Sequence, residues 1–294
     1  MIPDLSKLRL YDGLHTDAKR KTEEEEKTER KKANMARILD KLVALKEKKE
    51  KKANIAFILD KLVASKDILT TASMEIKELN LSQKGLPTIQ KFVDDRIWSL
   101  ENLTRLYLTR NWFGALVMKT FSDALSKRAL PKLTHLYIRA NGFGDEGMGS
   151  FADALNKRKL PYLITLDLRE NGFSTIGMAA FSDALSNGAL KNLKNLYLSN
   201  NNFGEGMSHF TKALKTNPLS ELETLLIRNN GISQNGISIF VNGIKEKKAL
   251  PKMTGIDLSK NHIKMFTGPV KDLFSHYGNK LRTVPLEMQL DHYV

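Results

Sequence analysis

Leucine and isoleucine recur with a fixed spacing over most of this chain. Residues 103–111 read Leu-x-x-Leu-x-Leu-x-x-Asn, and the same spacing returns five more times, twice with isoleucine and once with methionine and isoleucine in place of leucine. Residues two apart in an extended chain point to the same side, so each segment predicts a short strand with one buried face. Successive closing asparagines are 30, 30, 30, 29 and 31 residues apart, at Asn111, Asn141, Asn171, Asn201, Asn230 and Asn261.

A helix is predicted between each asparagine and the next strand. In each of these stretches two apolar residues stand four apart and so share one helical face. The pairs are Phe121/Leu125, Phe151/Leu155, Phe181/Leu185, Phe210/Leu214 and Phe240/Ile244. Strand–helix units at this period predict an α/β solenoid. Parallel strands lie about 4.8 Å apart and helices about 8–10 Å apart. The stack should therefore curve into a horseshoe, with the parallel strands inside and the helices outside.

The remaining sequence divides around this array. We expect an N-terminal segment over residues 1–16, a charged helical region over 17–70, repeats over 71–261 and a C-terminal cap and tail over 262–294. The first repeat is degenerate, because Lys84 stands where an asparagine is expected, and its helix is predicted over Thr88–Trp98. The last segment predicts a final helix followed by a closing strand or cap.

The charged region contains a second repeat. Residues 31–46 and 51–66 differ at only three of 16 positions, and each copy carries one apolar stripe at helical spacing. A shift of 20 residues turns a continuous helix by about 200°, so the two stripes would face nearly opposite ways on a straight rod. Either the helix folds back as a hairpin, which we favour, or the two faces engage different partners, including a second copy of the chain.

Composition and charge narrow the function. The chain has no cysteine, which excludes disulfides and thiolate sites and favours a cytoplasmic location. No apolar run is long enough to cross a bilayer, and the start does not resemble a secretory signal. The net charge of +14 is split between +6 in residues 17–66 and +8 elsewhere, so neither share reads as a nucleic-acid footprint.

No catalytic chemistry is predicted. Hydrolase, zinc-site, redox and nucleotide-binding motifs are missing, and the histidines lack metal-ligand spacing. Asp167 and Asp257 occupy equivalent strand positions three repeats apart, about 14 Å at the strand spacing, which is too far for a carboxylate pair. The sequence therefore predicts a protein that is not an enzyme and has no cofactor, metal or small-molecule substrate.

The candidate binding residues lie at the outward strand positions. We interpret the recurrent asparagines as structural, because an amide can satisfy backbone groups where each strand ends. The positions between the apolar ones are rich in tyrosine and arginine, types that are enriched at protein interfaces. The predicted concave-face residues are Arg105, Tyr107, Arg110, His135, Tyr137, Arg139, Asp167, Arg169, Tyr197, Arg228 and Asp257.

From Ile76 to Asn261 the repeats resemble the ribonuclease-inhibitor-like leucine-rich repeat proteins. They are also similar to the repeat regions of Ran GTPase-activating proteins, tropomodulins and nucleotide-sensing immune receptors. The resemblance implies the horseshoe fold but no single partner. The leading hypothesis is an intracellular scaffold that binds a protein on its concave face. The alternatives are a Ran-type regulator of small GTPases, which the resemblance alone suggests, and association of the basic helices with anionic membranes or nucleic acid.

Overall fold

A computed structural model describes residues 76–85, 89–90, 92–96, 100–127, 130–157, 160–247, 249–263, 268, 271–273 and 282–283. All of them belong to the second of the two units into which the chain divides, Ser73–Val294. The segments predicted over residues 1–16 and 17–70, with their tandem copies, lie outside the described residues.

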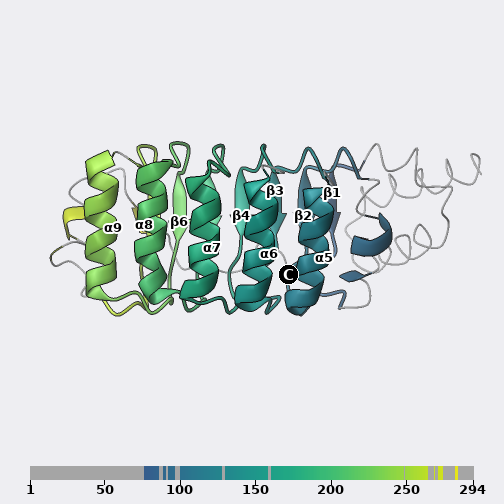
Figure 1. The fold of residues 1–294 in the computed structure, drawn as a ribbon, viewed down its shortest axis with the longest axis horizontal. Coiled ribbons are helices and arrows are strands. Elements are labelled where there is room, and N and C mark those ends of the chain that lie inside the picture. The colour runs from purple at the N-terminus through teal and green to yellow at the C-terminus, as the bar shows by residue number, and fades with distance from the viewer. Residues whose placement is uncertain are drawn as a thin grey trace, which may run out of the picture. The chain divides into compact units, whose positions relative to one another are not determined.

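The described residues form one open parallel sheet whose eight strands follow chain order. Each strand pairs with the next repeat's strand, and from β1 to β7 a helix lies between successive strands in the chain (Figure 1). The strands are β1 (Glu78–Asn80), β2 (Arg105–Tyr107), β3 (His135–Tyr137), β4 (Thr165–Asp167), β5 (Asn195–Tyr197), β6 (Thr224–Leu226), β7 (Gly255–Asp257) and β8 (Arg282–Thr283). This is the predicted α/β leucine-rich repeat solenoid.

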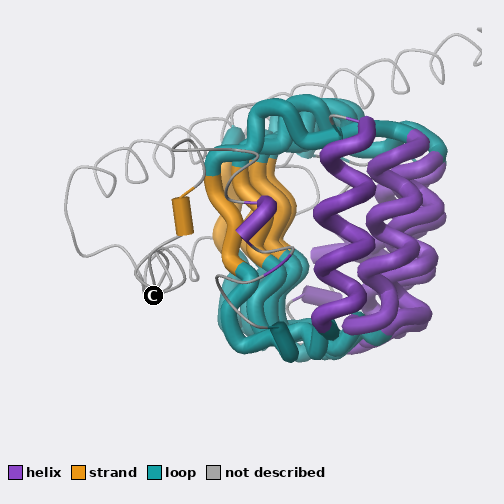
Figure 2. The backbone as a smooth tube through the Cα atoms, turned by 90° about the vertical axis from the view of Figure 1, so that its left-hand side faces the viewer, coloured by secondary structure: helices purple, strands orange, loops and turns teal. Residues whose placement is uncertain are grey.

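The helices form a second layer on one face of the sheet (Figure 2). Neighbouring helices pack side by side along the array (Figure 1). They are the π-helix η1 (Phe92–Arg96), α5 (Gly114–Ser126), α6 (Gly144–Asn156), α7 (Thr175–Ser186), the short 3-10 helix η3 (Gly204–Gly206), α8 (Met207–Thr216) and α9 (Gln234–Lys247). Of the helix predicted over Thr88–Trp98, the described residues are Ile89 and Gln90, which are helical, and η1.

The core lies between the two layers. The middle residue of each strand from β2 to β7 points inward and is at most 1% exposed. The predicted helix pairs are buried as well, and aromatic rings stack between repeats, with centroids 5.9 Å apart for Phe173 and Phe203. The apolar positions that define the repeat are therefore the core, as predicted. Burying each large side chain removes apolar surface from water and stabilises the stack.

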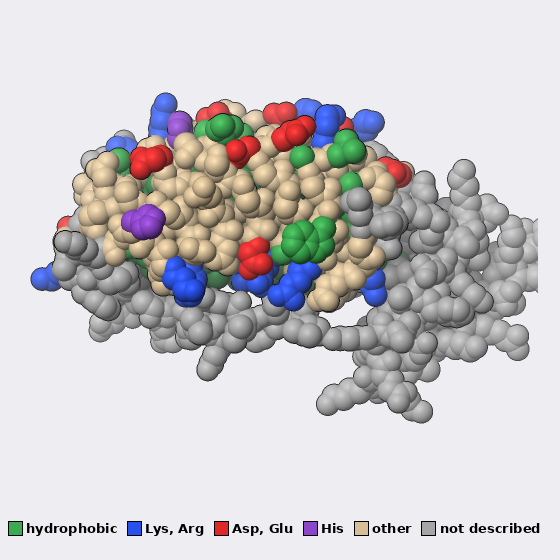
Figure 3. Space-filling view, turned by 90° about the horizontal axis from the view of Figure 1, so that it is seen from below, with side chains coloured by type: hydrophobic (Ala, Val, Ile, Leu, Met, Phe, Trp, Pro, Cys, Tyr) green, Lys and Arg blue, Asp and Glu red, His purple; other side chains and the backbone are tan. Residues whose placement is uncertain are grey.

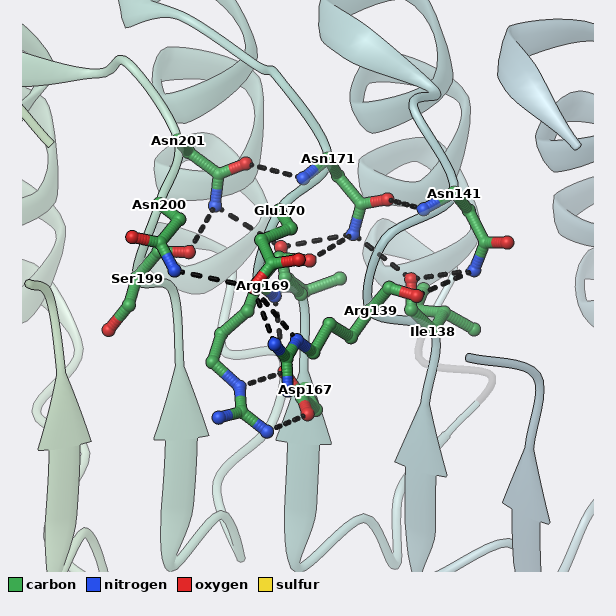
Figure 4. Close-up of polar contacts among 11 residues, drawn as sticks. Ile138, Arg139, Asn141, Asp167, Arg169, Glu170, Asn171, Ser199, Asn200 and Asn201 are labelled. Carbon is green, nitrogen blue, oxygen red and sulfur yellow. Dashed lines mark hydrogen bonds and ion pairs between the residues drawn. The ribbon is translucent and has the colours of Figure 1, made fainter. Parts of the chain in front are cut away.

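Asparagine side chains form a continuous ladder where the strands end (Figure 4). The amide of Asn171 donates to the carbonyl oxygens of Ile138 at 3.0 Å and Leu168 at 3.0 Å, and its side-chain oxygen accepts from the backbone N–H of Asn141 at 2.9 Å. The other five asparagines bond in the same way. The ladder thus joins each repeat to its neighbour, which confirms the structural interpretation.

The residue before each of these asparagines is left-handed. Its φ lies between 52° and 60° in all six repeats, although none of the six residues is glycine: Arg110, Ala140, Glu170, Asn200, Asn229 and Lys260. The left-handed conformation costs an L-residue roughly 1–2 kcal/mol. The asparagine bonds on either side offset this cost, and the turn carries the chain out of the sheet towards the next helix.

The C-terminal end is described only in part. Residues 271–273 are helical, within the segment that predicts a final helix, and β8 adds a closing strand beside β7. The remainder of the predicted cap and tail lies outside the described residues.

Candidate interaction surface

The strand face is the side of the sheet away from the helices (Figure 2). Because the strands pair in register, side chains at equivalent positions line up in three rows across it. The first row is Arg105, His135, Thr165, Asn195, Thr224 and Gly255; the second is Tyr107, Tyr137, Asp167, Tyr197, Leu226 and Asp257. The third row, two residues further on, is Thr109, Arg139, Arg169, Ser199, Arg228 and Ser259. The predicted residues fall in these rows except Arg110, which occupies the left-handed turn position.

Two tyrosines of the second row form a stack. The rings of Tyr107 and Tyr137 are parallel within 3°, with their centroids 4.6 Å apart, because β2 and β3 place them opposite each other. Tyr107 is only 2% exposed, whereas Tyr137 is half-buried. Tyr107 is therefore shielded from solvent, although it stands at an outward strand position. Parallel aromatic pairs are stabilised beyond the area they bury, so this stack is a rigid apolar element on the strand face.

An ion pair crosses from the third row to the next turn. The guanidinium of Arg139 donates from two of its nitrogens to one carboxylate oxygen of Glu170, at 3.0 Å and 2.6 Å (Figure 4). Asn200 donates to the same oxygen at 3.4 Å. The Arg139 side chain is 11% exposed, so water screens this pair less than a surface pair. The contacts hold the Arg139 side chain in one orientation.

A second ion pair joins Asp167, the last residue of β4, to Arg169, two residues further along the chain. Arg169 donates to both carboxylate oxygens of Asp167, at 2.8 Å and 2.6 Å, in the two-pronged geometry that suits a guanidinium (Figure 4). Its guanidinium carbon also lies 5.4 Å from the centre of the Tyr197 ring, within range of a cation–π contact. Asp167 is buried, and Arg169 supplies the partner that a buried carboxylate requires.

Two titratable groups on this face have shifted pKa values. Burial raises the pKa of Tyr197, and the Asp167 carboxylate adds to this, while Arg169 opposes it. Burial and the positive charge of Arg105 lower the pKa of His135 against the opposing effect of Glu78. Both shifts favour the uncharged side chain near neutral pH. The predicted residues that carry charge on the strand face are therefore its arginines and aspartates.

The C-terminal end of the face is hydrogen-bonded differently. Asp257 is buried and accepts from the backbone N–H of Ser259 at 3.0 Å and from its hydroxyl at 2.7 Å. Arg228 donates to the Ser259 hydroxyl oxygen at 2.8 Å. The structure thus brings Arg228 and Asp257 together through Ser259, whereas it leaves Asp167 in a separate pair with Arg169.

Two further residues lie in the turns beside these rows. Glu170 is the acceptor for Arg139, which only the three-dimensional turn reveals. Trp112 follows the first framework asparagine and is 77% exposed. Its signal in the sequence is that most equivalent repeat positions carry glycine.

Among the described residues, neither the distribution of charged side chains drawn in Figure 3 nor a group of possible metal ligands indicates another site. On the face drawn in Figure 3, basic, acidic and hydrophobic side chains are interspersed. Within the described ranges, no group of three or more His, Asp or Glu side chains is arranged to hold a metal ion. In the same ranges, none of the helices is both long enough and apolar enough to span a bilayer.

Comparisons with known proteins point to the repeat. Residues 129–152 and residues 192–213 each match a family model described as a leucine-rich repeat. A search of curated proteins finds no match. Among solved structures, the chain is similar to a TLR13–ssRNA13 complex (TM-score 0.40, 16% identity, 71% of this chain and 29% of that one). It is also similar to an internalin (inlF) of Listeria monocytogenes (TM-score 0.22, 14% identity, 79% of this chain and 94% of that one).

The chain thus spans less than a third of the length of the first of these structures. The first matched segment includes β3 and most of α6, and the second includes β5, η3 and most of α8. Resemblance to the ribonuclease-inhibitor-like subtype stays a prediction. Residues 129–152 and 192–213 are therefore similar to leucine-rich repeats, and the parallel sheet and the asparagine ladder continue the same unit through the described array.

Proposed function

We propose that this chain is a scaffold that binds a protein partner on the strand face. Leucine-rich repeats generally mediate protein–protein interactions, and stacked repeats offer an extended surface for them. The observation that supports this site is the contrast between the core and ladder positions and the positions in the three rows of the strand face. Core and ladder positions repeat the same residue types, whereas the three rows vary from repeat to repeat and are rich in tyrosine and arginine.

The contacts within the rows favour binding. Ordering a long side chain at an interface costs roughly 0.5–1.5 kcal/mol. Arg139 and Arg169 are already held by Glu170 and Asp167, and the Tyr107–Tyr137 stack is rigid. These side chains are already ordered, so a partner that docks on the exposed residues beside them orders few of them. The mixture of arginines and carboxylates on the face suits a partner of acidic or mixed charge.

We place this interaction in the cytoplasm. The reason is the absence of cysteine from the chain, which fits a reducing compartment. The proposed partner is a protein, and the activity is binding without catalysis.

Charge reversal at Arg105 tests the proposed site. Arg105 lies in the first row, is half exposed and pairs with Glu78 at 3.4 Å. Arg105→Glu should reduce the amount of partner captured from the native cell by about tenfold or more, because an interfacial arginine becomes a like charge for an acidic partner. Quantitative affinity capture on immobilised full-length chain measures this loss.

Lys119→Glu is the matched control. Lys119 lies in α5 in the helix layer, is exposed to a similar degree and also pairs with one carboxylate, that of Asp123 at 3.1 Å. Both variants therefore lose one exposed ion pair and change the net charge equally. Capture should survive Lys119→Glu. Equal loss of capture in the two variants, or no loss in either, would exclude the strand face as the binding site.

A further inference from the structure

The backbone of Trp112 is in the left-handed conformation, which is unfavourable for a bulky residue. It lies in the turn between β2 and α5 with φ at 54°. The equivalent positions of three other repeats are Gly142, Gly172 and Gly231, with φ of 63°, 73° and 71°. Glycine occupies this left-handed region without steric cost, whereas a bulky side chain there is an outlier. The turn geometry of the repeat therefore favours glycine at Trp112.

Packing does not account for the tryptophan either. The side chain is 77% exposed, so it contributes little buried apolar area to the fold. Strained residues that packing does not explain are concentrated at functional sites. An exposed tryptophan in this conformation therefore indicates a binding role.

A second exposed apolar side chain follows Trp112 in the chain. Leu116 is in the first turn of α5, four residues after Trp112, and is 76% exposed. The equivalent position in the next repeat is Glu146, which is also exposed, so the repeat itself does not require leucine here. Scattered exposed leucines are ordinary. Leu116 is the second exposed apolar side chain between the end of β2 and the first turn of α5, and Ile176 is exposed at the equivalent position two repeats on.

Two exposed cations, Lys84 and Arg110, lie beside the turn that carries Trp112. Arg110 precedes the ladder residue Asn111 and is exposed, and Arg105 is half exposed in β2. Lys84 is exposed in the preceding repeat, where its backbone N–H donates to the side-chain oxygen of Asn111 at 2.8 Å. Arg105 lies at the start of β2 and pairs with Glu78. The charge complement of this edge is therefore acidic.

We propose that the binding surface of the strand face continues over the turn to Trp112 and Leu116. The partner there is a protein segment with an apolar side chain flanked by Asp or Glu. The apolar side chain packs on Trp112 and Leu116, and the flanking carboxylates face Lys84, Arg105 and Arg110. Tryptophan and arginine are the residue types that most often dominate binding energy at interfaces. This inference rests on the proposed function of the strand face and names the chemistry of its partner.

The substitution Trp112→Gly separates binding from folding. Because glycine suits the left-handed turn, the variant should melt at the same temperature as the unchanged chain or higher. Trp112→Asn is a second variant, since asparagine also tolerates this conformation and adds less backbone freedom than glycine. Tyr162→Ala is the control: Tyr162 is exposed as well, but it precedes β4 and so lies at the opposite end of the strands.

The probe is a displayed library of random linear peptides, selected on the immobilised full-length chain. Selected peptides are synthesised with a fluorophore, and their affinities are measured by anisotropy. We expect an apolar residue flanked by Asp or Glu to be enriched. Trp112→Gly and Trp112→Asn should each weaken binding by about tenfold or more, as expected for a central interface residue. Tyr162→Ala should leave the affinity unchanged.

Three results would overturn the inference. Peptides that bind both Trp112 variants as tightly as the unchanged chain, yet lose affinity with Arg105→Glu, would confine the site to the strand face and leave the proposed function intact. Peptides insensitive to every one of these substitutions would remove both proposals. A lower melting temperature in both Trp112 variants would show that the tryptophan serves the fold.

Discussion

At the scale of single residues, Asp145 shows how one side chain joins two repeats. Its carboxylate lies near the start of α6 but accepts hydrogen bonds from the start of α7. The donors are the backbone N–H and hydroxyl of Ser174, both at 2.7 Å, and the backbone N–H of Gly177 at 2.8 Å. The first N–H groups of a helix lack partners within it, so Asp145 caps α7 from the neighbouring repeat.

The substitution Asp145→Asn should destabilise the fold at neutral pH by about 1–2 kcal/mol, since a neutral amide accepts these bonds more weakly than a carboxylate. Burial alone would raise the pKa of Asp145, but the hydrogen bonds from Ser174 and Gly177 outweigh it and lower that pKa. A lowered folded-state pKa stabilises the fold above the ordinary carboxyl pKa of about 4. This stabilisation is lost as the pH falls through the folded-state value.

Urea unfolding at pH 7 and at about pH 3 therefore measures the effect, and the gap between the unchanged chain and Asp145→Asn should narrow at the lower pH. Glu146→Gln is the control, because it removes the adjacent, exposed carboxylate. If Glu146→Gln destabilised the chain as much as Asp145→Asn, the capping role would be wrong.

At the scale of elements, the close packing of α6 against α7 depends on Gly177. A Cβ at this position would lie 2.7 Å from a carboxylate oxygen of Asp145 and 2.8 Å from the Cβ of Phe173. Gly149, in α6, has open space where its Cβ would stand. The two helical glycines therefore differ in what a side chain at their position would meet.

This difference predicts opposite effects of the same substitution. Gly149→Ala should stabilise the chain by about 0.5–1 kcal/mol, because alanine favours the helix and nothing obstructs it. Gly177→Ala should destabilise it by about 1–3 kcal/mol, because the methyl group forces Asp145 and Phe173 apart. Chemical denaturation of both variants measures the two changes, and a shift in the same direction would contradict the packing of α6 on α7.

At the scale of the whole molecule, the spacing of the repeats predicts the buried core and the asparagine ladder. Spacing alone identifies Leu106 and Leu108 as core and Asn111 as ladder, because every repeat must bury the same positions to stack on its neighbours. The same alternation predicts the rows of the strand face, because it decides which way a strand residue points.

The interactions within the rows could not be predicted in this way. That Arg139 binds Glu170, or that Arg169 binds Asp167, depends on turn geometry and side-chain rotamers, which vary between repeats. The left-handed turn residues carry no sequence signal either, since types as different as Ala140 and Lys260 occupy them. Only at Trp112 does a departure from glycine mark the conformation.

The ladder also makes the effect of one substitution depend on its place in the array. Asn171 is fully buried in a central repeat, so Asn171→Ala should leave backbone groups of two repeats unsatisfied and cost about 1–3 kcal/mol. Asn261 makes equivalent bonds but is partly exposed near the end of the described array, where water can replace them.

Asn261→Ala should therefore cost less than Asn171→Ala, and urea unfolding of the two variants compares them directly. Asn202→Ala, which removes an exposed asparagine beside the ladder, is the control and should have little effect. Equal losses at Asn171 and Asn261 would mean that burial does not set the strength of the ladder. A larger loss at Asn171 means that the central repeats, which carry the Arg139 and Arg169 ion pairs, are the most firmly held part of the strand face.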